Sequence, residues 1–382
     1  MNKIITIYLL FFISIGYSQK KKSNDSILNN DFITEDSLST IEYYKTLEPN
    51  ITNLSLLGKA FEASGYYNKA ISTFEKVLTM KDDMDNIRFQ LAGLYIKKFQ
   101  YDNAKINLDT LIQKNSKNAS YFYQRGVVAQ KEKDSSYINY FKRAFLINSN
   151  HIPSIQKLAT YYILNKPKDS ALFFIDRGLS LNNTNIVLIN LKAQYYFHKK
   201  KYGDAIKLFE KLLMYGENDD YIYEKLAIAN NKLDQINEAL KYYLILLEKN
   251  KKSPIIHYEI GVLYQDKEVK DSAIFYLEKA LDLKKVSNLN EYFRLSQLYT
   301  EKKDYQKAIF YLKLMLNEQP DYYMGYYQIA FLADQYYADP KLKLQYYESF
   351  KKVVPPEFQM EKYLEYADKR ISELKMEIHF NN

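Results

Sequence analysis

Small residues recur along this chain at an almost constant interval of about 34 residues. Nine of them lie at Gly58, Ala92, Gly126, Ala159, Ala193, Ala227, Gly261, Ser296 and Ala330. Successive intervals are between 33 and 35 residues, and amino-acid composition alone does not produce so regular a period. The period therefore predicts an array of similar structural units rather than a few unrelated compact domains.

The repeated unit is clearest between Ile186 and Asp219. Apolar residues recur there at spacings of two to four residues in two stretches, which are separated by the polar segment from His198 to Lys201. This spacing follows one face of a helix, so each unit is predicted to be a hairpin of two amphipathic helices. A second row of small residues marks the second helix of most units: Ala70, Ala104, Ala171, Ala205, Ala239, Ala273 and Ala308. Small side chains at both positions let the two helix backbones approach closely.

This helix–turn–helix period resembles the tetratricopeptide repeat, whose pattern is W-x2-L-G-x2-Y…A-x3-F…P. Leu57, Gly58, Phe61, Ala70 and Phe74 form one copy of the pattern. The opening Trp is absent throughout the chain, and the closing Pro is mostly absent. The resemblance implies an all-α fold, a right-handed superhelical solenoid of about nine helical hairpins over residues 51–354. It also implies a concave surface, lined by the first helices, that binds an extended peptide or a helix of a partner.

Residues 1–18 have the layout of a secretory signal peptide. Lys3 precedes an apolar run from Ile4 to Ile15, and small residues stand at Gly16 and Ser18. The run is shorter than the ~20 residues of a membrane-spanning helix, so we expect cleavage before residue 19, with a retained anchor as the alternative. No other stretch is long and apolar enough to span a bilayer. We therefore expect an exported bacterial protein of the periplasm or cell envelope, or a secreted protein.

The repeat array is predicted to have a separate segment at each end. Residues 19–50 form a polar linker in which Asp36 can cap a short helix that extends to Tyr44. At the other end, Pro355 and Pro356 interrupt the last repeat. An apolar stripe with charged residues between its members then predicts a capping helix in residues 355–382, which covers the end of the array.

The sequence contains no recognisable catalytic, cofactor-binding or metal-binding pattern. It has no cysteine, its four histidines are scattered, and no glycine-rich phosphate loop joins a strand to a helix. The net charge of +8, from 54 basic and 46 acidic residues, is spread along the chain, whereas nucleic-acid-binding proteins concentrate positive charge on one face. We therefore expect a non-catalytic protein without cofactor or metal that does not bind nucleic acid.

The resemblance places the residue three positions before each first-helix small residue on the concave surface. Five of these positions are aromatic and are the candidate partner-binding residues: Phe89, Tyr123, Tyr258, Phe293 and Tyr327. The other four are polar: Ser55, Gln156, Asn190 and Glu224. Exposed aromatic rings provide large contact areas at protein interfaces. The alternative is that these rings pack on the neighbouring first helix.

Two functions are consistent with this sequence. The first is a scaffold or adaptor that binds a protein or peptide partner through the concave surface, in the envelope or outside the cell. The alternative is a glycan-binding or glycan-uptake component in which tyrosine rings stack on sugars. Flat, solvent-facing aromatic rings grouped in one shallow site would favour the glycan function.

Overall fold

The computed structural model describes residues 35–165, 169–284, 288–356 and 358–380. The predicted signal peptide, residues 1–18, lies outside these ranges. The chain divides into two compact units, residues 1–191 and residues 192–382. The boundary falls inside helix α11 (Ile186–His198).

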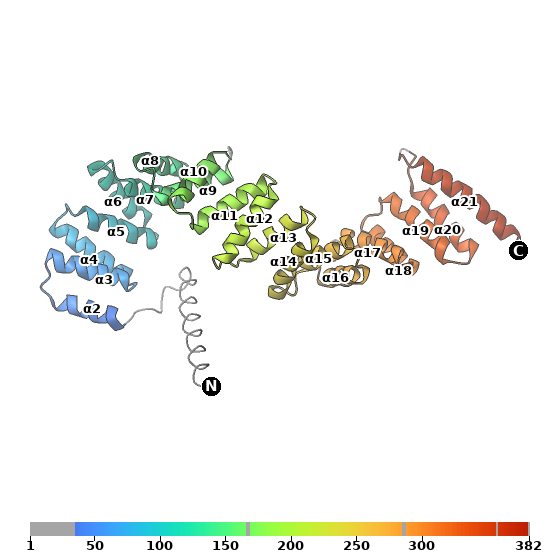
Figure 1. Cartoon of the computed structure of the whole chain (residues 1–382), viewed down its shortest axis with the longest axis horizontal. Coiled ribbons are helices and arrows are strands. Elements are labelled where there is room, and N and C mark those ends of the chain that lie inside the picture. Colours follow the sequence, from blue (N-terminus) through green and yellow to red (C-terminus); the bar gives the residue numbers. More distant parts are fainter. Residues whose placement is uncertain (1–34, 166–168, 285–287, 357, 381–382) are drawn as a thin grey trace, which may run out of the picture. The chain divides into compact units, whose positions relative to one another are not determined.

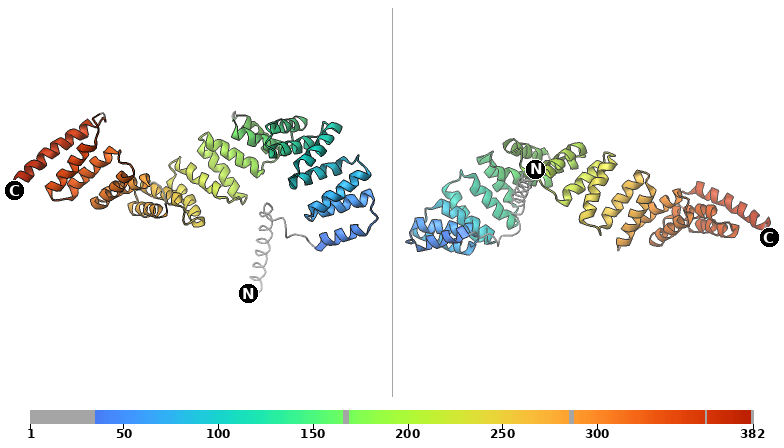
Figure 2. Two further views of the ribbon diagram at one scale, coloured as in Figure 1. Left: turned by 180° about the vertical axis from the view of Figure 1, so that it is seen from behind. Right: turned by 60° about the horizontal axis from the view of Figure 1, so that its bottom comes forward.

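Within the described ranges, all regular secondary structure is helical, which confirms the predicted all-α class, and helices α3 to α20 follow one another along the chain as nine helix–turn–helix pairs (Figure 1). The two helices contact each other in the eight pairs that lie within one unit. The first helices of the hairpins are α3 (Ile51–Ala63), α5 (Asp85–Lys97), α7 (Ala119–Lys131), α9 (Ile152–Leu164), α11, α13 (Asp220–Asn231), α15 (Pro254–Asp266), α17 (Leu289–Glu301) and α19 (Tyr323–Tyr336). The second helices are α4 (Tyr67–Met80), α6 (Tyr101–Lys114), α8 (Tyr137–Ile147), α10 (Asp169–Leu181), α12 (Tyr202–Met214), α14 (Ile236–Lys249), α16 (Lys270–Leu283), α18 (Tyr305–Glu318) and α20 (Pro340–Val353). The views in Figure 2 show the same stacking of hairpins within each unit.

Every small residue that defines the repeat is buried where two helices meet. The nine first-helix residues and the seven second-helix alanines are all inaccessible or nearly so. At Gly58 the approach is closest, because a Cβ atom added there would lie 2.4 Å from Cε1 of Phe74 on α4. A Cβ atom at Gly126 would likewise lie 2.7 Å from Cε1 of Phe141 on α8. The period found in the sequence is therefore the period of close helix–helix contact.

Among the described residues, seven of the hairpins have the same backbone geometry in the turn between their two helices. In the last turn of α17, Lys303 N donates to Thr300 O at 2.9 Å and Asp304 N donates to Tyr299 O at 2.9 Å, which is a Schellman motif. The residue in the left-handed region is Gly65 in the first hairpin and Lys303 in this one, with φ of 75° and 61°. Equivalent turns place five further non-glycine residues in this region: Phe99, Lys133, Lys200, Asp234 and Glu268.

This geometry predicts opposite effects for two substitutions. Gly65→Ala should lower the free energy of unfolding by about 1 kcal/mol, because a Cβ atom at positive φ is strained. An added Cβ would have no atom within 4 Å, so no packing change contributes to this loss. Lys303→Gly should raise the thermal midpoint by removing the same strain. Urea and thermal unfolding monitored by circular dichroism measure both effects.

Gly203→Ala is the matched control for Gly65→Ala. A Cβ atom at Gly203 would also meet no atom within 4 Å, but this glycine lies in the first turn of α12 and its φ is not positive. Alanine should therefore stabilise this position by up to about 1 kcal/mol. Equal effects of alanine at Gly65 and at Gly203 would contradict the strain argument.

A helix packs against each end of the described array. Helix α2 (Glu35–Thr46) contacts α3, and Ile41 of α2 lies in the same apolar core as Leu54. Helix α21 (Glu361–Phe380) packs on α20 through Ala367 and Leu374, which join Phe350 in a separate core. In the part of the chain that the structure describes, none of the helices combines the length and apolar character needed to cross a membrane.

Candidate partner-binding surface

All nine residues predicted to line the concave surface lie on first helices. The five aromatic candidates are half-buried, and so are Ser55, Gln156 and Asn190, whereas Glu224 is exposed. Phe89 and Tyr123 belong to the first unit, and Tyr258, Phe293 and Tyr327 belong to the second. Each unit therefore provides its own candidate aromatic residues, two in the first and three in the second.

In the first unit, each candidate ring contacts a residue on the next first helix or directly before it. The ring of Phe89 on α5 lies 5.2 Å from that of Tyr121 on α7. The ring of Tyr123 on α7 lies 5.7 Å from that of Phe141 and 5.4 Å from the imidazole of His151, at the start of α9. Burial raises the pKa of the Tyr123 hydroxyl above its ordinary value. These rings each use part of their surface in packing and leave part of it accessible.

In the second unit, Tyr258 takes part in a polar contact between neighbouring hairpins. Arg294 on α17 donates from Nε to the Tyr258 hydroxyl at 3.1 Å and from Nη1 to Gln265 Oε1 at 2.7 Å. Its guanidinium also lies 5.8 Å from the Tyr258 ring centroid. Phe293 precedes Arg294 and packs at the edge of the apolar core of this unit. The hydrogen bonds fix the Tyr258 hydroxyl while its ring stays half-exposed.

Tyr327 is the candidate whose surroundings are most fully occupied by the chain itself. Its ring lies 5.4 Å from Phe350 on α20 and 4.8 Å from Tyr363 on α21. Tyr366 of α21 and Phe331 of α19 are also within ring-contact distance. The terminal helix thus provides aromatic neighbours to the last candidate position. Phe331, Tyr363 and Tyr366 each keep about two fifths of their surface exposed.

A second row of first-helix residues, two positions before each small residue, was missed by the sequence analysis. Seven of its nine members are polar or charged: Gln90, Gln124, Lys157, Lys225, Glu259, Arg294 and Gln328. The side-chain oxygens of Gln90, Gln124 and Gln328 are buried and accept no hydrogen bond from the protein. Polar residues that recur at one repeat position were the available signal, because a helix face that only packs would be apolar.

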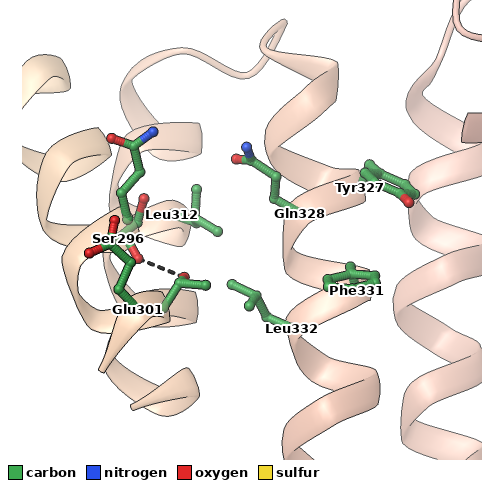
Figure 3. A pocket seen from close by; sticks show the side chains of 9 residues that line it. Ser296, Glu301, Leu312, Tyr327, Gln328, Phe331 and Leu332 are labelled. Carbon is green, nitrogen blue, oxygen red and sulfur yellow. Dashed lines mark hydrogen bonds between the residues drawn. The ribbon is translucent and has the colours of Figure 1, made fainter. Parts of the chain in front are cut away.

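Two cavities lie beside this polar row. In the second unit, a cavity of about 340 Å³ separates α17 from α19 (Figure 3). Figure 3 shows Gln328 and Leu332 extending from α19 toward α17, which contributes Ser296 and Glu301. In the first unit, a cavity of about 240 Å³ lies beside Lys157 and Tyr123. Both cavities combine apolar walls with a few polar side chains, as binding sites commonly do.

Several exposed apolar side chains on the second helices also follow the repeat. Four of them stand two residues after the second-helix alanine: Ile106, Phe173, Phe275 and Phe310, each more than half exposed. The resemblance to the tetratricopeptide repeat indicates a binding surface on the first helices, so it did not point to these second-helix residues. These residues are useful comparison sites, since they have the same chemistry on the other helix of the hairpin.

Comparison with known proteins identifies repeats in both units. Sequence profiles of the tetratricopeptide repeat match residues 54–88, 255–286 and 292–322. The first match begins in α3 and ends in α5, and the other two cover most of the hairpins α15–α16 and α17–α18. The matched segments agree with hairpins one, seven and eight of the register set by the small residues.

Solved structures with a related arrangement share little sequence identity with this chain. A tetratricopeptide repeat protein from Parabacteroides merdae is 14% identical, with a TM-score of 0.44 over 63% of this chain and 95% of that chain. YrrB, described as a TPR protein with an unusual peptide-binding site, is 21% identical, with a TM-score of 0.43 over 48% and 95% of the two chains. The pilF protein of Pseudomonas aeruginosa is 15% identical, with a TM-score of 0.40 over 53% of this chain and 92% of that chain.

Because those identities and TM-scores are low, the family assignment depends on the matched repeats and on the helical hairpins themselves. The three matches share the register of small residues that extends through all nine described hairpins. The chain is a tetratricopeptide repeat protein.

Proposed function

We propose that this protein is an exported, non-catalytic adaptor that binds a partner polypeptide through its first-helix surfaces. Tetratricopeptide repeats act in general as scaffolds for protein–protein interaction. The observation that supports this proposal most strongly is the row of unpaired glutamine oxygens beside half-buried aromatic rings. Both kinds of group stand side by side in the sequence on three first helices, α5, α7 and α19.

Unpaired buried acceptors make these surfaces suited to a partner that brings hydrogen-bond donors. A buried polar atom without a partner costs about 1–3 kcal/mol, and native proteins contain few such atoms. The oxygens of Gln90 and Gln124 are of this kind in the first unit, and that of Gln328 is in the second. A polypeptide that lies in an extended conformation presents backbone N–H groups at regular intervals, so it could satisfy several of these acceptors.

The aromatic candidates would supply the apolar part of the same contact. Phe89 in the first unit and Tyr258 in the second are half-buried, so each ring is held in place while part of it faces solvent. Partly ordered rings lose little entropy when a partner covers them, which is why aromatic residues dominate binding energy at many interfaces. The cavity beside Gln328 has room for an apolar side chain of the partner.

The test of this proposal compares aromatic residues on the two helices of a hairpin. After a partner has been isolated on the immobilised protein, its affinity should fall at least about tenfold in Phe89→Ala or Tyr258→Ala. Phe173→Ala and Phe275→Ala are matched controls, because these rings are 59% and 54% exposed and lie on second helices. Losses of affinity confined to the second-helix variants would overturn the proposal.

Export is the second part of the proposal and depends on residues 1–18. The short apolar run and the small residues before Gln19 support signal cleavage at that point. Mass spectrometry of the protein from fractionated cells should find a mature amino terminus at Gln19 in the envelope or the medium. An intact Met1 on protein from the cytoplasm would overturn this part alone.

Glycan binding stays a prediction of the sequence. The aromatic group around Tyr327 in the second unit does not favour glycan binding, because two of its rings meet the Tyr327 ring edge to face. Tyr363 is inclined by 64° and Tyr366 by 78° to the Tyr327 ring. A sugar-stacking site needs the flat face of a ring to be open, and these contacts direct ring edges at ring faces.

A further inference from the structure

The cavity of the first unit is lined by a lysine that forms no ion pair with an acid among the described residues. Lys157, on α9, has its ammonium group 2.9 Å from Gln130 Oε1, to which it donates, and 5.8 Å from the centroid of the Phe141 ring. The aromatic wall of the cavity is made by Tyr123, Tyr137 and Tyr161. The rings of Tyr137 and Tyr161 lie 6.1 Å apart.

Other buried cations of this unit are paired with acids. Arg88 forms an ion pair with Asp82, and Arg125 forms one with Asp109, in which Nε lies 2.9 Å from Oδ1. No acid of the described residues forms an ion pair with Lys157; the charge that acts on it comes from Lys131. Burial and that like charge lower the pKa of the Lys157 ammonium. A half-buried cation without a counter-ion destabilises the folded chain. Perturbed titratable groups in cavities are concentrated at functional sites.

The dimensions of the cavity favour a side chain over a whole small molecule. Sites for small molecules usually enclose about 300–1,000 Å³, and this cavity encloses about 240 Å³. Its rings can contact methylene groups, while Lys157 can receive a carboxylate. Gln156 and Thr160 line the same opening and can hydrogen-bond to a peptide backbone.

We infer that this cavity receives an acidic side chain, aspartate or glutamate, from an extended segment of a partner polypeptide, whose carboxylate pairs with Lys157. The inference rests on the proposed function and adds the chemistry of the segment that is bound. The carboxylate supplies the counter-ion that the fold itself lacks. The rings of Tyr137 and Tyr161 enclose the methylene groups that connect the carboxylate to the partner backbone.

The experiment uses full-length mature protein on an array of ten-residue peptides. The peptides are arranged in pairs that differ only by glutamate or glutamine at one internal position, with amidated and free carboxyl termini. Wild-type protein should bind the glutamate members of the selected pairs at least tenfold more tightly, and this preference should decrease with added salt. Lys157→Gln should abolish the preference, and Lys157→Arg should retain it.

Lys225→Gln is the matched control, because Lys225 occupies the same repeat position in the second unit but is already paired with Glu224 at 3.2 Å. It should leave the glutamate preference unchanged. The thermal midpoint of Lys157→Gln should not fall, because the substitution removes an unpaired charge.

The outcomes separate this inference from the proposed function. Peptide binding without a glutamate preference, or a preference that survives Lys157→Gln, overturns the inference and leaves the adaptor function intact. A requirement for a free carboxyl terminus also overturns it, since the carboxylate then comes from a chain end. Binding of the acidic polysaccharide polygalacturonate through Lys157, with no binding of any peptide, would overturn both.

Discussion

Replacing Phe209 with alanine should lower the free energy of unfolding by about 3–5 kcal/mol. Phe209 lies on α12, is completely inaccessible to solvent, and contacts the rings of Phe197 on α11 and Tyr221 on α13. Its removal leaves a cavity between two successive hairpins. Because repeats depend on contacts with their neighbours for stability, the loss should spread to α11 and α13. Urea unfolding combined with amide hydrogen exchange of these helices measures both effects.

Phe310→Ala is the control for that experiment. Phe310 is the same residue type on the second helix of another hairpin of the same unit, but it is 54% exposed. Its replacement should cost less than about 1 kcal/mol, because little buried volume is removed. If the two substitutions destabilised the protein equally, Phe209 would not have the packing role that the structure gives it.

Arg370→Ala should detach the terminal helix α21 and cost about 3 kcal/mol. Arg370 donates from Nε and Nη2 to the two carboxylate oxygens of Asp334 on α19, at 2.7 and 3.1 Å. The Asp334 side chain is 9% exposed, and its other partners are the Lys343 ammonium at 3.3 Å and the Tyr347 hydroxyl, which donates to it at 3.4 Å. Breaking a buried ion pair costs about 3–5 kcal/mol. Because Lys343 still pairs with Asp334 in Arg370→Ala, we expect a loss at the lower end of this range. Protease sensitivity of residues 358–380 together with thermal unfolding monitors the loss.

The same group predicts how stability depends on pH. Burial raises the pKa of the Asp334 carboxyl, but hydrogen bonds and charge from Arg370 and Lys343 outweigh burial and hold the pKa below its ordinary value. A carboxyl whose folded pKa is lowered contributes stability above its unfolded pKa of about 4. That contribution is lost as the pH falls from about 4 through the folded pKa. In Arg370→Ala this part of the acid dependence should be smaller.

Lys375→Ala is the control for the terminal helix. Lys375 also reaches from α21 to α20, where its ammonium lies 3.4 Å from Glu348, but both side chains are about half exposed. An exposed pair contributes at most about 1 kcal/mol. Lys375→Ala should therefore leave both the thermal midpoint and the acid dependence close to wild type. A large effect there, or none in Arg370→Ala, would contradict the assigned role of Asp334.

The hairpin array could be predicted because its period is set by direct contact. Gly58 and Ala70 are buried where paired helices meet, so a change in size at such positions is costly and their spacing remains visible in the sequence. The conformation of the turns could not be read in the same way. Among the described hairpin turns, position 65 has a glycine, the residue best suited to positive φ, whereas Phe99 and Lys200 adopt it within Schellman hydrogen bonds.

The candidate surface was only partly predictable. The resemblance placed Phe89 and Tyr258 on first helices, but whether a ring is open depends on the neighbouring hairpin. Tyr327, for example, meets Tyr363 of the terminal helix, which no local pattern indicates. The unsatisfied oxygen of Gln124 and the hydrogen bond of Lys157 to Gln130, in place of an ion pair, likewise depend on how neighbouring helices pack. The sequence period predicts which residues lie on the first helices, but their exposure to solvent depends on how the neighbouring hairpins pack.

Site-specific photo-crosslinking tests the central claim of first-helix binding most directly. A photoreactive phenylalanine analogue is introduced singly at Phe89, Tyr258, Phe173 or Phe275, and the protein is irradiated with its isolated partner. Adducts should form at Phe89 or Tyr258, on first helices, and be absent at Phe173 and Phe275, which lie on second helices and are more than half exposed. Adducts at Phe173 or Phe275 alone would contradict the account.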